Sequence, residues 1–314
     1  MSKVATRDAY GKTLVQLGAE NKDIVVLDAD LSKSTKTSDF AKAFPERFFD
    51  MGVAEQNMIG TAAGLAAAGK VPFASSFAMF ATGRAFEQIR NSIAYPGLNV
   101  KIAATHAGIS VGEDGASHQS IEDIAIMRAL PNMTVIVPAD GTETEHAIRA
   151  AVDFKGPVYI RLGRLALPVL FDETYKFEIG KAVTVREGTD ATVIACGLMV
   201  GPAIEAADQL SQENIKVRVI NMSTVKPVDR EAIVKAAEET KAIVTAEEHN
   251  VIGGLGGAVA EVLAQTVPVV VEMVGVKDTF GESGPPAELL EKYGLTAKDV
   301  VIAVKKVIAR KTRL

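Results

Sequence analysis

Several features that would narrow the class of this protein are scarce or missing. Tryptophan is absent, and the 314 residues include one cysteine, Cys196. A single cysteine excludes an internal disulfide framework and fits a reducing cytoplasm, where we expect the protein to act. Residues 1–10 lack the apolar stretch of a signal peptide. The longest run of apolar and small residues, Ile59–Ala68, is interrupted by glycine and falls short of the roughly 20 residues that cross a bilayer.

Strong charge of one sign is also missing. The net charge of −5 provides no basic field that would attract nucleic acid or an anionic membrane. Hydrophobic residues make up 48% and charged residues 23%, which is the balance of a soluble globular protein. A chain of this length can form two domains, each with its own core. Cys196 ends an apolar run that starts at Ala191, so we expect a buried thiol rather than a nucleophile.

Short runs rich in valine and isoleucine alternate along the chain with segments of helical periodicity. Continuous apolar strands that alternate with helices indicate parallel sheets covered on both faces. We therefore predict an α/β fold with two consecutive open parallel-sheet domains. The pattern lapses over residues 169–179, which we interpret as a linker between domains at 1–168 and 180–314. The expected strands are Ile24–Leu27, Val100–Ala104, Thr134–Val137, Val158–Ile160, Ala191–Cys196, Val217–Ile220, Ala242–Val244 and Val267–Val271.

The first specialised polar segment is LDADLSKST, which follows the strand expected at Ile24–Leu27. In open parallel sheets, ligands bind at the carboxyl ends of the strands. Asp28, Asp30, Ser32 and Ser34 are therefore expected to leave the sheet on the binding side. A plain N-cap cluster for the next helix is the alternative interpretation.

The second segment is FFDMGVAEQNMIG, at Phe48–Gly60. Glu55 begins a helix rich in glycine and alanine. The helix macrodipole alone would explain a carboxylate in this first turn. However, the small residues that follow it, Gly60 and Ala62–Gly64, allow another chain or a flat ligand to approach closely. This combination favours a functional carboxylate.

The third segment is THAGISVGEDGASHQ, at Thr105–Gln119. It follows a strand directly and holds two of the four histidines, His106 and His118. A loop with so many polar residues and glycines commonly lines a site, although solvated loop histidines are the simpler alternative. Metal ligands at short spacing are missing, so we predict no metal site in this chain. The GGLGG cluster after His249 lacks the GxGxxG spacing, and we expect it to form a turn into a helix.

At these three segments the chain resembles transketolase, over essentially its whole length and in the C-terminal part of that family. The strings DADL, MGVAEQNM, SFAMF, THAGISVGEDGASHQSIE and EEH–GGLG occur in the family's order. The resemblance implies a pyrimidine-binding domain followed by a transketolase C-terminal domain. It also implies thiamine diphosphate as cofactor and transfer of a two-carbon glycolaldehyde unit from a ketose phosphate to an aldose phosphate.

The resemblance further implies roles for particular residues. Glu55 would hydrogen-bond N1′ of the thiamine aminopyrimidine, with Phe77 and Phe80 packed on that ring and Asp30 beside the cofactor. A family aromatic residue near Gly83 is missing here. Histidine suits proton transfer near neutral pH, and the catalytic pair implied is Glu55 and His118. The substrate residues implied are Asp114 and His118 at the donor hydroxyl and carbonyl groups, and Ser34, His106 and Arg164 at the sugar phosphate.

One motif of thiamine diphosphate enzymes is missing. The resemblance implies a GDG, followed by asparagine, that holds Mg²⁺ and the diphosphate. The sequence has only EDG at Glu113–Gly115 and ADG at Ala139–Gly141. We therefore expect an N-terminal transketolase subunit with the GDG motif to ligate the Mg²⁺. Two copies of each subunit would then form a heterotetramer.

Three alternatives remain open. A subunit like deoxyxylulose phosphate synthase shares the GVAEQ string, and so does a 2-oxoacid dehydrogenase β-type subunit. The third alternative is a partner that only scaffolds or regulates an enzyme. The GEDG–HQ string favours transketolase over the first two. The set of Glu55, Phe77, Phe80, Asp114 and His118 argues against the third.

Overall fold

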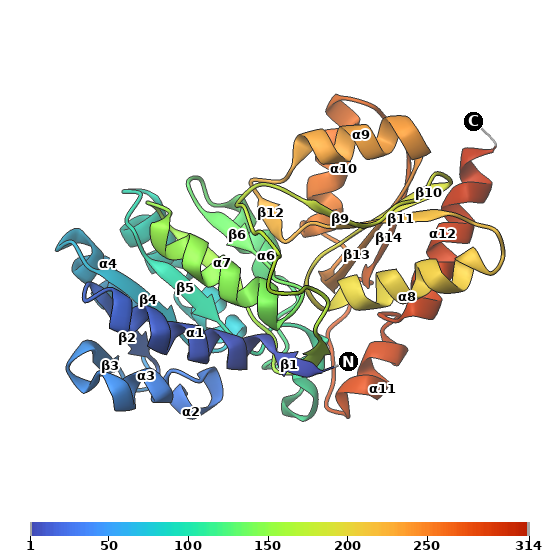
Figure 1. The fold of residues 1–314 in the computed structure, drawn as a ribbon. Coiled ribbons are helices and arrows are strands. Elements are labelled where there is room, and N and C mark those ends of the chain that lie inside the picture. Colours follow the sequence, from blue (N-terminus) through green and yellow to red (C-terminus); the bar gives the residue numbers. More distant parts are fainter. Residues whose placement is uncertain (1, 313–314) are drawn as a thin grey trace.

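Two sheets built mainly from parallel strands organise the chain (Figure 1). The structure is a computed structural model and describes residues 2–312. The first sheet has the order β12-β6-β7-β5-β4-β2-β3, and all of its pairings are parallel except that of β12 with β6. Its strands are β2 (Ile24–Asp28), β3 (Phe48–Asp50), β4 (Val71–Ser75), β5 (Lys101–Ala104), β6 (Thr134–Ile136), β7 (Val158–Arg161) and β12 (Thr224–Lys226).

The second sheet has the order β14-β13-β10-β11-β9, and only the pairing of β9 with β11 is antiparallel. The predicted α/β class with two consecutive, mainly parallel sheets is thus confirmed. A separate antiparallel pair joins β1 (Lys3–Ala5) to β8 (Ala166–Pro168). The strands of the second sheet are β9 (Val183–Arg186), β10 (Ala191–Ala195), β11 (Val217–Asn221), β13 (Ala242–Asn250) and β14 (Val270–Val276).

Helices cover both faces of each sheet, as the continuous apolar strands require. On the first sheet, α1 (Thr6–Glu20) and α7 (Gly141–Asp153) lie on one face, opposite α4 (Glu55–Ala67). On the second sheet, α8 (Val200–Ser211) and α12 (Ala297–Lys311) lie on the outer face, opposite α9 (Arg230–Thr240) and α10 (Leu255–Gln265). The shorter helices are α2 (Ser32–Thr35), α3 (Ser38–Ala43), α5 (Phe86–Gln88), α6 (Asp123–Ala129) and α11 (Pro286–Lys292).

One apolar core extends from the first sheet to the second and belongs to both. It contains Val25 and Leu27 of the first sheet together with Ile194 and Ile243 of the second. The chain also crosses between the units through β12, which comes from the second half of the sequence and pairs with β6. The boundary at residues 169–179 stays a prediction. The shared core and β12 show that the parts on either side of it pack as one structure.

Several elements differ from the sequence prediction, which did not include the strands β1, β3, β4, β8, β9 and β12. The strand β4 was not predicted, because Pro72 and Ser75 interrupt its apolar pattern, yet it pairs with β2 and β5 in the middle of the sheet. Apolar residues recur at helical spacing over Arg84–Ala94, yet this region forms π-helical turns at Phe80–Arg84 and Ile89–Ala94 around the short α5. Such turns are frequent at functional sites. No helix within residues 2–312 is long and apolar enough to cross a membrane.

Candidate functional site

The polar segments singled out in the sequence follow adjacent strands of the first sheet. One follows β2, Ser76 follows β4, Thr105 follows β5 and Arg164 lies just past β7. Because these strands are parallel and neighbouring, the segments meet at one edge of the sheet, which is the usual ligand position in this architecture.

Glu55 is the first residue of α4, and its side chain is only 1% exposed. The hydroxyl of Ser76 donates to Oε1 at 3.4 Å. The guanidinium of Arg84 donates to Oε2, with 2.7 Å between Nη1 and Oε2. A buried carboxylate with one strong donor retains lone pairs that can accept a further hydrogen bond. The prediction of a functional carboxylate thus has a suitable geometry.

Aromatic rings form a wall beside this carboxylate. Phe77 is stacked with His106 at 3.8 Å between ring centroids, and with Phe80 at 6.0 Å. His118 meets the ring of Phe80 edge-on at 5.1 Å. The predicted cofactor residues Phe77 and Phe80 and the predicted substrate residues His106 and His118 therefore lie in one cluster.

His106 is held as a neutral ring. Its Nε2 lies 3.0 Å from Nη1 of Arg7, and its Nδ1 lies 2.8 Å from the hydroxyl of Thr105. Arginine can only donate, so Nε2 is the acceptor and the proton sits on Nδ1. Burial, together with the charges of Arg7 and Arg164, lowers the pKa of His106 to about 3. His106 would therefore shape the pocket and orient Arg7 rather than carry a charge.

Arg7 is a site residue that the sequence prediction missed. Its Nη1 also donates to the carbonyl of Ser34 at 3.1 Å, while its buried Nε donates to no atom of the described residues. Burial lowers the pKa of Arg7; the charge of Asp8 opposes this effect and that of Arg164 adds to it. Arg7 and Arg164 thus face the same region. No local signal in the sequence marks it, because the β1–β8 pairing of the folded chain brings the start of α1 beside the segment after β7.

Arg164 links this cation cluster to the GEDG loop. Its Nη1 donates to the carbonyl of Val111 at 2.9 Å and lies 3.5 Å from Glu113 and 3.8 Å from Asp114. Asp114 is exposed. His118 is half-buried, and its Nδ1 lies 3.0 Å from the hydroxyl of Ser117. The Nε2 atom of His118 has no hydrogen bond to another atom within residues 2–312.

The loop after β2 has two carboxylates with different surroundings. Asp28 is fully buried and accepts from the backbone of Leu31 at 2.7 Å and from the hydroxyls of Thr35 and Thr37 at 2.6 and 2.8 Å. Burial raises its pKa. The expectation that Asp28 faces the ligand is wrong, because its oxygens are used to fold this loop. Asp30 has a positive φ of 61° and is exposed, and its place beside a ligand stays a prediction.

Arg161 and His249, which are close in sequence to the segments discussed above, are internal. Arg161 is buried, and its Nε donates to Asp123 at 2.8 Å, so it does not join the cation cluster. His249 is fully buried between the carbonyl of Asn250 and the backbone nitrogen of Ala125. Glu247 accepts from the backbone nitrogens of Leu255 and Gly256, both at 2.7 Å, so the GGLGG turn leads into α10 as predicted.

The fold and the site together define one half of a composite enzyme site in an α/β protein. A buried acceptor under an aromatic wall lies beside a cluster of arginines that would bind an anion. Two family models match the chain: the pyrimidine binding domain of transketolase over residues 2–169 and the transketolase C-terminal domain over residues 180–300. The chain belongs to the transketolase family, whose enzymes depend on thiamine diphosphate, and corresponds to the C-terminal half of a split transketolase.

Relatives and solved structures agree with this assignment. A Methanocaldococcus jannaschii protein named as a transketolase C-terminal section is 54% identical, covering 94% of this chain and 93% of the relative. The 6-deoxy-6-sulfo-D-fructose transketolase subunit SqwH of a Clostridium species is 46% identical, over 97% and 95%. A split-gene transketolase solved as an inactive β4 tetramer is 59% identical, with a TM-score of 0.91 over 99% and 100%. The transketolase of Leishmania mexicana is 28% identical, with a TM-score of 0.84, and this chain matches 46% of its length.

Proposed function

We propose that this chain is the pyrimidine-binding subunit of a two-subunit transketolase. With an N-terminal partner, it transfers a two-carbon glycolaldehyde unit from a ketose phosphate to an aldose phosphate. The observation that carries the proposal is the convergence at one sheet edge of the buried Glu55, the Phe77–Phe80 wall and the Arg7–Arg164 cation cluster. A cofactor whose ring nitrogen donates a hydrogen bond to Glu55 and a sugar with an anionic tail would both fit this edge.

The residues present fit the pyrimidine end of thiamine diphosphate. An aminopyrimidine is a flat ring with polar nitrogens, and it needs an acceptor on its edge and apolar contacts on its face. Glu55 offers the acceptor, while Phe77 and Phe80 offer the contacts. Within residues 2–312, no three His, Cys, Asp or Glu side chains are arranged to hold a metal ion. We assign the diphosphate and Mg²⁺ to the partner subunit, as the missing GDG suggests.

Each site residue then has a defined task. When bound, thiamine diphosphate supplies a carbanion and an electron sink for cleaving the bond beside a ketose carbonyl. Glu55 holds a hydrogen bond at N1′ of the pyrimidine. His118, with its free Nε2, exchanges a proton with the sugar oxygens, and Asp114 accepts from a donor hydroxyl. Asp30, exposed at the turn after β2, would lie beside the bound cofactor.

The anionic end of the donor is assigned to Arg7 and Arg164, with Ser34 as an added donor. Two guanidinium groups favour an oxyanion that accepts several hydrogen bonds. His106 contributes by accepting from Arg7, which fixes that guanidinium. The relative named as a sulfofructose transketolase subunit favours a second candidate substrate, a ketose with a sulfonate tail. Comparing phosphorylated and sulfonated ketoses in one assembled enzyme decides between them.

The partner subunit provides the sharpest test of the proposal. Calorimetry with thiamine diphosphate and Mg²⁺ is expected to show weak binding to this chain alone and tight binding once a GDG-containing subunit is added. Two-carbon transfer should appear only in the mixture, with two copies of each subunit in the complex. A relative solved as a β4 tetramer is described as inactive, which supports the expectation that this chain alone does not catalyse the transfer. Tight cofactor binding by the isolated chain would contradict the assignment of the diphosphate and Mg²⁺ to the partner subunit.

A further inference from the structure

The GEDG loop is held in place largely by the second half of the chain. The loop begins with a buried segment, Ile109–Gly112, and ends at the exposed Asp114. Its base is closed by a bridge between Ala107 and Ser120. Ile109 packs into the core of the second sheet, and the polar residues beyond it are fixed by contacts with other segments.

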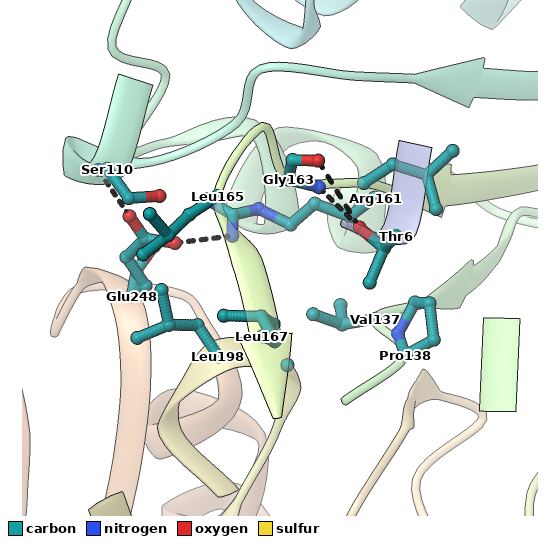
Figure 2. A pocket seen from close by; sticks show the side chains of 12 residues that line it. Thr6, Ser110, Val137, Pro138, Arg161, Gly163, Leu165, Leu167, Leu198 and Glu248 are labelled. Carbon is teal, nitrogen blue, oxygen red and sulfur yellow. Dashed lines mark hydrogen bonds and ion pairs between the residues drawn. The ribbon is translucent and has the colours of Figure 1, made fainter. Parts of the chain in front are cut away.

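Glu248 of β13 makes the closest of these contacts. Its Oε1 accepts from the backbone nitrogen of Ser110 at 2.6 Å (Figure 2). Its Oε2 lies 3.9 Å from Nη1 of Arg161, whose Nη2 donates to the carbonyls of Glu248 and Ser120 at 2.9 and 3.3 Å. Gly108 has a positive φ of 85°, and a Cβ there would meet the carboxylate of Glu248 at 2.3 Å. The absence of a side chain at Gly108 therefore allows the loop backbone to approach the carboxylate of Glu248 closely.

A second set of contacts comes from the segment before α11. The side chain of Gln119 donates to the carbonyls of Ile109, Gly112 and Glu282 at 3.3, 3.2 and 2.9 Å, and so joins the loop to that segment. Gly115 also faces it closely, since a Cβ there would lie 2.5 Å from the hydroxyl of Ser283. The substrate residues Asp114 and His118 thus lie between two contacts with the second half of the chain.

We infer that Glu248 is a positioning residue of the transfer reaction. By holding the amide of Ser110, it sets the GEDG loop and thereby the places of Asp114 and His118 relative to the donor sugar. The part of this inference that concerns the sugar rests on the proposed function. The cofactor residues Glu55, Phe77 and Phe80 belong to other segments, so the inference predicts an effect on the donor and none on the cofactor.

Hydrogen exchange and donor kinetics test this role together. In Glu248→Leu, the amide of Ser110 loses its acceptor while staying buried, so exchange over residues 107–120 should accelerate at least tenfold in the isolated chain. In the assembled enzyme, the same variant should raise the donor KM on the order of tenfold, with thiamine diphosphate affinity unchanged. Glu248→Gln keeps an acceptor oxygen and should restore most of the exchange protection.

Glu272→Gln is the matched control. Glu272 lies on the neighbouring strand β14 and bonds to Lys306 and Arg310 of α12, so its loss should change neither the loop nor the donor KM. Unchanged exchange at 107–120 in Glu248→Leu, or equal acceleration throughout both sheets, would overturn the positioning role. Faster loop exchange with an unaltered donor KM would show that Glu248 holds the loop but does not affect donor binding. A wild-type complex without transfer activity would instead overturn the proposed function, while exchange would still decide the Glu248 contact.

Discussion

Arg84 holds the carboxylate of Glu55 at 2.7 Å and, with its guanidinium carbon 5.0 Å from the ring centroid of Phe80, also covers the aromatic wall. The two partners differ greatly in exposure, 48% for the arginine side chain and 1% for the glutamate. The buried charge of Glu55 is therefore stabilised from the solvent side. A ligand nitrogen would meet a carboxylate that already carries one strong donor.

We predict that Arg84→Met destabilises the chain by about 1–2 kcal/mol, because a buried carboxylate loses its charged partner and keeps only a long contact with Ser76. The free energy of urea unfolding measures this. The control is the same substitution in a Glu55→Gln background, where no buried charge remains and the loss should shrink. Equal losses in both backgrounds would show that Arg84 acts through its packing on Phe80.

Glu55→Gln is expected to lower turnover roughly 10²-fold or more in the assembled enzyme, since an amide cannot organise the proton at N1′ as a carboxylate does. Assembly should be intact, because the two side chains have the same shape. Size-exclusion chromatography and a two-carbon transfer assay measure the two properties. A variant within about threefold of the wild type would reduce Glu55 to a carboxylate that stabilises a helix start.

Arg164→Ala should lower kcat/KM for phosphorylated ketoses by on the order of 2–4 kcal/mol, since a charge-assisted contact with the phosphate is lost. Arg7→Ala should behave alike, because its unpartnered Nε and its place beside Arg164 assign it to the same anion. The loss in kcat/KM should be much smaller with hydroxypyruvate, a donor that has no phosphate. The measurement is the ratio of the two losses within one complex.

Arg161→Ala provides the contrast. It removes the partner of the fully buried Asp123, so we expect it to cost about 3–5 kcal/mol of stability. Its activity should fall equally with both donors, in step with the folded fraction. Two results would contradict the assignment of the phosphate to Arg164. One is a loss selective for phosphorylated donors in Arg161→Ala, and the other is an equal loss with phosphorylated ketoses and hydroxypyruvate in Arg164→Ala.

Lys101 gives the stability a predictable dependence on pH. It is fully buried, and Nζ donates to the side chain of Asn99 at 2.7 Å and to the carbonyls of Phe154 and Gly156 at 2.8 and 2.9 Å. Burial, aided by the charge of Lys155, lowers its pKa to about 7. An unfolded lysine titrates near ~10.4, so between these values the unfolded chain binds more protons. The contribution of Lys101 to stability therefore rises with pH across this window.

The matched variant is Lys101→Met, which cannot titrate. Unfolding free energies at about pH 7 and pH 9.5 should increase with pH more in the wild type than in the variant, by at most ~1.4 kcal/mol per pH unit. Parallel pH dependences in the two proteins would show that the three acceptors keep the lysine charged throughout.

The sequence predicted the fold class well, because continuous apolar strands such as Val158–Ile160 have few other uses in a soluble protein. It also singled out Glu55 and the GEDG loop, whose residue types are unusual for a core. It failed where tertiary contacts decide the outcome. Nothing local distinguishes Arg7 from a solvated helix-start arginine, since only the β1–β8 pairing brings it to Arg164. Asp28 and Asp30 are two residues apart, and backbone conformation alone separates a folding role from an exposed one.

The strand β12 bears on how such a gene can be divided or recombined. A breakpoint between the codons for Pro168 and Thr224 would leave β6 as an open edge of the first sheet. It would also expose the apolar residues of the first sheet that now share a core with Ile194 and Ile243. An uncovered strand edge readily pairs with other chains and leads to aggregation. The two halves of this chain are therefore expected to be inherited together, and swapping the second half between relatives should succeed only when β12 and its β6 partner come from the same parent.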